Sequence, residues 1–302
     1  MGWILLLIVL ICFVVFVLKS MSFKFRLAPE TLEIRPIKGL KKMTDILEQS
    51  LSNGFMEHVE MRVKEKNRLK ENEYDWRLLD LKRYFLMTAF LKESPMFSEK
   101  VDEIWHEMLM FTREYEDASK NYLGKKLHHS PNVNGKPDPD LRGFFDWVYA
   151  ELFFIRDENI FLYKGFFRHP VHPNVIEQFR TLTEDELIDL YFKRDTTYTA
   201  TVQALIAAMK KSAARVKNYE KKTVREMMRR SKTKQNYNAM LVPVLSVSYF
   251  HYDEFTSYMK ISSDSRSSCT SCGSGGFHTS DSNGSSGSSC SSDSSCSSCG
   301  GD

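Results

Sequence analysis

The sequence predicts a mostly α-helical protein with one membrane-spanning helix at its N-terminus and a disordered tail. Residues 2–18 are apolar and uncharged, apolar side chains recur at helical spacing from residue 43 to 260, and Ser, Gly and Cys dominate residues 262–302. The 302-residue chain is 42% hydrophobic and 27% charged. This balance excludes a polytopic transporter and a chain that is disordered throughout.

We divide the chain into five segments by composition. They are a transmembrane anchor (1–20), a basic juxtamembrane linker (21–42), a helical domain (43–197), a basic long helix with a C-terminal element (198–260), and a low-complexity tail (261–302). Five of the six Cys lie in the tail, which excludes a small disulfide-stapled fold.

The first segment resembles an uncleaved single-span anchor. Seventeen residues, Gly2–Leu18, cover about 25 Å as a helix, close to the thickness of a bilayer core. No basic residue precedes this run and no small-residue cleavage site follows it, so a signal peptide is disfavoured. Lys19, Lys24 and Arg26 follow the span, and the positive-inside rule then places the body in the cytoplasm. We therefore expect a single-pass protein of the cell membrane.

Helix boundaries in the body follow from local signals. We expect helices over Met43–Leu51 and Phe55–Lys70, separated at Asn53-Gly54. Ser98 is a predicted N-cap. Thr183, with Glu186 three residues later, predicts a capping box at the start of the next helix.

The segment Thr199–Lys234 is predicted to be one long helix. From Lys210 to Lys234 it carries eleven Lys or Arg against Glu220 and Glu226. This bias fits a solvated face or contact with anionic lipid near the anchor. Nucleic acid is the least favoured partner, because no nucleic-acid-binding module accompanies the charge.

Chemistry-bearing residues concentrate in Val101–Tyr115. On a helix, its core face would comprise Val101, Ile104, Trp105, Met108, Phe111, Thr112 and Tyr115. Asp102 and His106 lie one turn apart on a flank, where the carboxylate can meet the imidazole. That arrangement is typical of metal ligands and general bases. Glu107 is expected on the opposite, water-facing side and is a further candidate for a general base.

A second histidine element, His128-His129, begins a Pro- and Gly-rich loop. Adjacent His side chains usually point apart, so at most one of them needs to join His106 and Asp102. His106 with His128 or His129 then gives a candidate site for Zn²⁺ or another divalent metal. The alternative is a purely structural role, and the His-Glu-x-x-His zinc pattern is absent because position 110 is Met.

These residues resemble a known motif. It is carried by V-D-x-x-W-H at Val101–His106, F-T-R-x-Y at Phe111–Tyr115 and L-H-H-S-P at Leu127–Pro131. Together they are similar to the glycine-rich domain-containing protein-like family over Leu81–Pro131. The resemblance implies one recurrent unit of Trp105, His106, His128 and His129, and it implies no biochemical activity. The family tends to place an aromatic residue and a Cys where this chain has Ala118 and Ser119, so no thiol-based role is implied there.

Two further groups could bind metal. His169 and His172 flank a Pro-rich turn, which fits either a ligand pair or a rigid surface loop. Cys269-x-x-Cys272 and Cys296-x-x-Cys299 have zinc-type spacing, although Ser-Ser-Cys repetition generates such spacing readily.

The sequence contains no phosphate-binding Gly loop, nucleophile elbow or dinucleotide fingerprint. The leading interpretation is therefore a membrane-anchored helical scaffold that presents a surface to a protein partner. The alternative is a metal-binding domain or metal-dependent hydrolase that uses His106 with His128 or His129.

Overall fold

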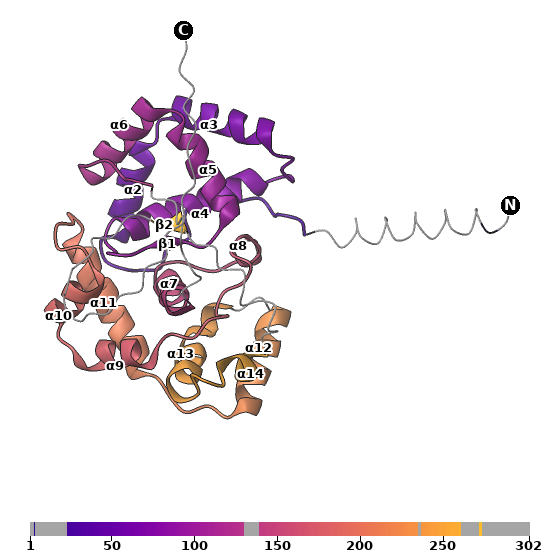
Figure 1. Cartoon of the computed structure of the whole chain (residues 1–302), viewed down its shortest axis with the longest axis vertical. Helices are drawn as coiled ribbons and strands as arrows, with labels where there is room; N and C mark the ends of the chain where they lie inside the picture. Colours follow the sequence, from indigo (N-terminus) through magenta and orange to yellow (C-terminus); the bar gives the residue numbers. More distant parts are fainter. Residues whose placement is uncertain (1–2, 4–22, 130–138, 235–236, 261–271, 274–302) are drawn as a thin grey trace, which may run out of the picture.

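The computed structural model describes residues 3, 23–129, 139–234, 237–260 and 272–273. Over these residues the chain is mostly helical, as predicted (Figure 1). The predicted anchor lies outside the described residues except for Trp3, and the tail does so except for Cys272 and Gly273. Within the described part, no helix combines the length and apolarity needed to cross a membrane.

A first group of helices forms one end of the molecule (upper part of Figure 1). It comprises α2 (Leu40–Ser50), α3 (Asn53–Lys66), α4 (Glu73–Thr88), α5 (Glu99–Leu109) and α6 (Thr112–Leu123). Helix α5 packs against α3, α4 and α6, and α2 packs against α4 and α6. The predicted break between the first two helices exists, but it falls at Leu51-Ser52 because Asn53 and Gly54 already belong to α3.

A second group forms the other end (lower part of Figure 1). It comprises α7 (Pro139–Leu152), α8 (Asp157–Leu162), α9 (Pro173–Thr181), α10 (Glu184–Tyr191), α11 (Thr199–Ala214), α12 (Lys221–Lys234), the 3₁₀ helix η1 (Tyr237–Ala239), α13 (Leu241–Phe250) and α14 (Phe255–Met259). Helix α9 packs on α11 and α13, and α12 packs on α14. The buried apolar side chains of both groups form one continuous core.

Two short strands complete the described structure. β1 (Pro95–Met96) pairs antiparallel with β2 (Cys272–Gly273), with Met96 opposite Cys272. A piece of the tail therefore returns to the segment that leads into α5, which composition alone did not predict.

The local capping signals are confirmed. The Ser98 hydroxyl accepts a hydrogen bond from the Val101 amide at the start of α5. At α10, Thr183 and Glu186 form the reciprocal capping box. Both features depend on neighbours within three residues, so the sequence is enough to specify them.

The prediction of one helix over Thr199–Lys234 is wrong. The chain forms α11 and α12 with residues 215–220 between them. In the break, the Lys217 amide donates to Ser246 Oγ of α13 at 2.9 Å, and Asn218 lies 3.3 Å from the His251 ring. Ser246 thus satisfies one of the backbone amides that the break leaves without a helical partner.

A buried polar network ties the two groups together. Arg83 of α4 is fully buried and donates to Tyr149 of α7 at 2.7 Å. Tyr149 donates in turn to Asp80, which also accepts two hydrogen bonds from Asn159 of α8. Each partner offsets the cost of burying the others, so the network fixes how α4, α7 and α8 meet.

A second buried carboxylate, Glu73, joins α4 to α5. It accepts hydrogen bonds from Arg77 at 2.7 Å and from Lys100 of α5 at 2.8 Å. Burial opposes its ionisation, but the hydrogen bonds from Lys100 and Arg77 outweigh that effect and hold the pKa of Glu73 below its usual value.

We predict that Glu73→Gln lowers the free energy of unfolding by about 1–3 kcal/mol at pH 7. Because the folded-state pKa is depressed, this contribution is fully present above the unfolded pKa of about 4.3 and is lost as the pH falls through the folded value. Urea unfolding at pH 7 and pH 3 should therefore show a gap between wild type and variant that closes in acid.

The control is Glu57→Gln, which removes an exposed carboxylate from α3. It should change stability little at either pH. If the free energy of unfolding of wild type exceeded that of Glu73→Gln by the same amount at pH 7 and pH 3, the ion-pair explanation would be contradicted.

Candidate metal centre

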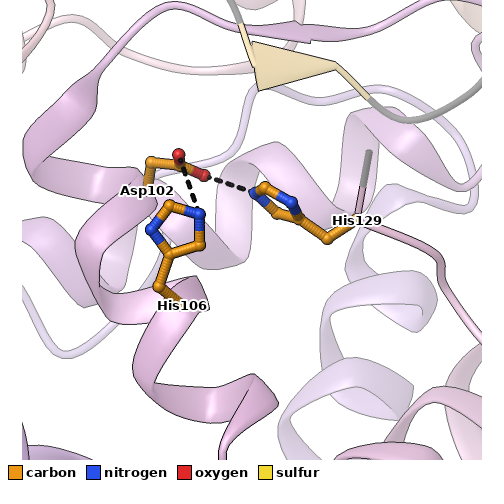
Figure 2. A group of neighbouring side chains, drawn as sticks. All are labelled: Asp102, His106 and His129. Carbon is orange, nitrogen blue, oxygen red and sulfur yellow. Dashed lines mark hydrogen bonds and ion pairs between the residues drawn. The ribbon is translucent and has the colours of Figure 1, made fainter. Parts of the chain in front are cut away.

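Three ligand-type side chains converge beside α5. Asp102 and His106 lie on α5, and His129 lies in the loop after α6. One possible ligand atom from each residue lies within 4.8 Å of the other two. Figure 2 shows both imidazole rings approaching the same carboxylate.

The carboxylate of Asp102 lies between the two rings. Its Oδ1 is 2.9 Å from His129 Nε2, and its Oδ2 is 3.5 Å from His106 Nε2. The ring centroids of His106 and His129 are 4.7 Å apart. The predicted contact between Asp102 and His106 one turn later is therefore present.

The core face of α5 holds Asp102 in place. Val101, Ile104, Trp105 and Met108 are buried, as the helical spacing predicts. Trp105 packs against Tyr84 and Phe85 of α4, with ring centroids 5.5 and 5.3 Å away. The indole fixes the rotation of α5, and Asp102 consequently emerges at the edge of the core.

A short chain of hydrogen bonds positions His129. The Trp105 indole Nε1 donates to the Tyr115 hydroxyl at 2.9 Å, and that hydroxyl donates to the Leu127 carbonyl at 2.7 Å. The Trp105 ring also meets the His129 ring edge to face, with centroids 4.3 Å apart. The loop is thus attached to the core two residues before the imidazole that it supplies.

Burial in the cluster is uneven. The side chains of Asp102 and His129 are 6% and 5% exposed, whereas that of His106 is 51% exposed. The cluster therefore has a fixed, desolvated side and a side open to water. An exposed imidazole can turn toward a bound ion without disturbing the core.

The spacing suits a transition metal. In a tetrahedral zinc site, bonds of about 2.0–2.2 Å place neighbouring ligand atoms about 3.3 Å apart. The carboxylate–imidazole distances are 2.9 Å from Oδ1 to His129 and 3.5 Å from Oδ2 to His106, so the exposed His106 ring would turn toward Oδ1 to share one ligand oxygen. The two imidazole nitrogens and one carboxylate oxygen would leave a fourth position for water or another ligand.

The structure separates the two neighbouring histidines. His129 joins the cluster, whereas His128 is exposed and lies outside it. Sequence reasoning allowed either residue. The Tyr115–Leu127 hydrogen bond holds the loop at this point, and the motif residues alone do not state which of the two imidazoles it turns toward Asp102.

The expectation that Glu107 faces water is wrong. This residue is 6% exposed and accepts hydrogen bonds from Lys66 and from Arg62 Nε, the latter at 2.8 Å. Burial favours the neutral form, but both cations outweigh it and keep the pKa of Glu107 below its usual value. A carboxylate engaged in this way is a poor general base, and its role is to hold α5 against α3.

The expected continuous helix through Tyr115 is also wrong. α5 ends at Leu109, and α6 begins at Thr112. Between them, the Phe111 ring packs near Phe55 and His58 of α3, with centroids 6.0 and 5.9 Å away. The bend brings Tyr115 within hydrogen-bonding distance of Trp105, which a straight helix would not do.

The other candidate ligands lie elsewhere. His169 is buried, and His172 accepts a hydrogen bond from the Asn174 amide at the start of α9. Among the described residues, neither belongs to a metal-type cluster. Of the tail cysteines, Cys272 is described only as part of β2, and the others lie outside the described residues.

Residues 42–143 are similar to the UCP032817-like family, whose name states no activity. This match covers most of α2, all of α3 to α6, and all three residues of the cluster. The resemblance to a family without a known activity is therefore supported, whereas the glycine-rich name is not. No curated protein and no solved structure matches the chain.

We predict that Tyr115→Phe lowers the free energy of unfolding by about 1–3 kcal/mol, because Trp105 Nε1 and the Leu127 carbonyl both lose a buried partner. The matched control is Tyr163→Phe. The Tyr163 hydroxyl is also buried but has no hydrogen-bond partner within the described part of the chain. Urea denaturation should separate the two variants, and equal losses would contradict the proposed role of Tyr115.

Proposed function

We propose that this domain binds a divalent transition metal, Zn²⁺ foremost, through Asp102, His106 and His129. The observation that carries the proposal is the convergence of three ligand atoms within 4.8 Å from two separate segments. A buried carboxylate between two imidazoles is a costly arrangement unless its partners satisfy it. Bound metal would satisfy all three side chains at once.

The ligand types favour zinc over a hard cation. Imidazole nitrogen suits Zn²⁺, Fe²⁺ and Cu²⁺, whereas Mg²⁺ and Ca²⁺ take oxygen ligands. Two imidazoles and one carboxylate are also a common set for sites that keep one position open. The exposed side of His106 is consistent with such an open position.

The proposal extends to metal binding and not to hydrolysis. Glu107, the candidate general base, is held by Arg62 and Lys66. Glu103, on the same helix, pairs with Arg77. A metal at this site would link α5 to the loop after α6, so we assign it a structural or partner-binding role within a scaffold.

We further propose that the domain is tethered to the cell membrane with its body in the cytoplasm. The uncharged run Gly2–Leu18 and the basic residues that follow it support this arrangement. A membrane-bound scaffold would present the helical body to a protein partner. The basic residues of Lys210–Lys234 supply positive charge that would favour contact with anionic lipid.

We predict that full-length protein, purified in mild detergent and dialysed against zinc, retains about one Zn²⁺ per chain. His129→Ala and Asp102→Asn should each reduce retention by about tenfold or more, because each removes one of three ligands. Mass spectrometry of the purified protein measures the metal content directly.

The matched control is His128→Ala, which removes the adjacent, exposed imidazole and should leave retention unchanged. Circular dichroism confirms that each variant is folded. Equal metal content in His129→Ala and wild type would reject the site. Loss of metal on removal of residues 261–302 alone would instead assign the ion to the tail cysteines.

We predict that deletion of residues 2–18 moves the protein from the membrane fraction to the supernatant after cell lysis. In intact cells, an epitope after residue 260 should resist external protease and become sensitive only after permeabilisation. A matched variant that keeps residues 2–18 but lacks residues 261–302 should stay in the membrane fraction. Cleavage of the epitope in intact cells would contradict the proposed orientation.

A further inference from the structure

A second feature lies in the other half of the molecule, apart from the metal-type cluster. A cavity of about 690 Å³ opens between α7, α11, α12 and the start of α13. Helices α11, α12 and α13 lie in the lower part of Figure 1, α7 lies near its centre, and α5 lies in the upper part. The volume falls within the range typical of small-molecule sites, about 300–1,000 Å³.

The charge around the cavity is strongly positive. Four cationic side chains line it: Arg35, Lys211, Arg215 and Arg230. Glu151 of α7 is the one acidic side chain among the described lining residues. The break between α11 and α12 creates this arrangement, because it folds the basic segment around a concavity instead of leaving it along one straight helix.

The carboxyl group of Glu151 interacts with two of these cations, Arg35 and Arg215. Burial raises the pKa of Glu151, against hydrogen bonds from Ser212 and Trp147. The Trp147 indole Nε1 donates to Glu151 at 3.2 Å. Arg230 also pairs with Glu226 at 4.0 Å, and the lining still carries four cationic side chains against the one carboxyl group of Glu151.

Arg35 is the most firmly placed of the cations. Its Nε donates to the Phe153 carbonyl at 3.3 Å, its Nη2 donates to Asn238 Oδ1 at 3.1 Å, and its guanidinium lies over the Phe154 ring. A guanidinium has five N–H donors, so this placement uses only part of its capacity. Burial lowers the pKa of Arg35, as expected where a cation is desolvated without a carboxylate hydrogen bond.

We propose that this cavity binds a phosphate monoester that carries an apolar group. Guanidinium groups match the oxygen geometry of phosphate, and several cations together favour a dianion over a monoanion. The rest of the wall combines polar groups of Ser212, Tyr219 and Asn238 with an apolar part that suits an apolar body. That apolar part is formed by Ala150, Ala208, Met227, Ala239, Met240, Leu241, Val242 and Pro243. The monoester belongs either to a soluble metabolite or to the headgroup of a lipid such as phosphatidic acid.

The test uses the full-length protein in mild detergent. Isothermal titration calorimetry measures its binding of inorganic phosphate, phenyl phosphate and benzyl alcohol. Phenyl phosphate should bind about tenfold or more tightly than either of the others, because it alone offers both the charge and the apolar group. The double variant Lys211→Ala/Arg215→Ala should weaken this binding by about tenfold or more.

The matched control is Lys41→Ala/Lys42→Ala, which removes the same charge from exposed positions on α2 outside the cavity. It should bind phenyl phosphate as wild type does. A second arm measures flotation with phosphatidylcholine vesicles, with and without phosphatidic acid, using protein that lacks residues 2–18.

The outcomes distinguish the two sources. Binding of phenyl phosphate without a preference for phosphatidic acid assigns the site to a soluble monoester. Flotation that requires both phosphatidic acid and the Lys211/Arg215 pair assigns it to a lipid headgroup. The proposal is rejected if wild type binds neither probe, or if the two double variants lose binding equally.

Discussion

The hydrogen bonds from Trp105 to Tyr115 and from Tyr115 to Leu127 are the constraint on which the candidate metal centre depends. Trp105 is fully buried against α4 and fixes the rotation of α5, and therefore the position of Asp102. Tyr115, on α6 beyond the bend, connects Trp105 to the Leu127 carbonyl in the following loop. These two bonds hold the loop at Leu127, two residues before His129, whose ring then packs on Trp105 and reaches Asp102.

This dependence shows what the motif residues contribute. Trp105 and Tyr115 touch no ligand atom of the cluster through their polar groups, yet they determine which side chains meet. Asp102 and His106 are one helical turn apart and would be neighbours on any helix. His129 is different, because it is 27 positions from Asp102 and needs the intervening chain to follow one particular path. The recurring pattern thus describes a folded unit rather than a set of ligands.

Sequence reasoning succeeded where the determining contacts are local. The Ser98 cap, the Thr183–Glu186 box and the buried face of α5 all depend on neighbours within a few residues. Predictions from the sequence were wrong where contacts with distant helices determine whether a side chain is buried. Glu107 is buried because Arg62 and Lys66 reach it from α3, which periodicity within α5 cannot reveal.

In the basic segment Lys210–Lys234, too, a distant helix determines the local structure. Its composition fits one long helix, but Ser246 of α13 captures a backbone amide in the break. Because the chain turns here, Lys211, Arg215 and Arg230 line one cavity instead of lying along a single straight helix. The choice of His129 over His128 also depends on tertiary contacts. The two residues are adjacent and of the same type, so the local sequence does not distinguish them.

The central claim is that metal, when bound, is held by imidazole and carboxylate rather than by the tail thiols. Zinc-edge X-ray absorption on the full-length protein loaded with one equivalent of Zn²⁺ tests it most directly. We predict nitrogen and oxygen neighbours at about 2.0–2.2 Å with the multiple-scattering pattern of two imidazoles. A shell of sulfur atoms at about 2.3 Å would contradict the claim and place the ion on cysteine.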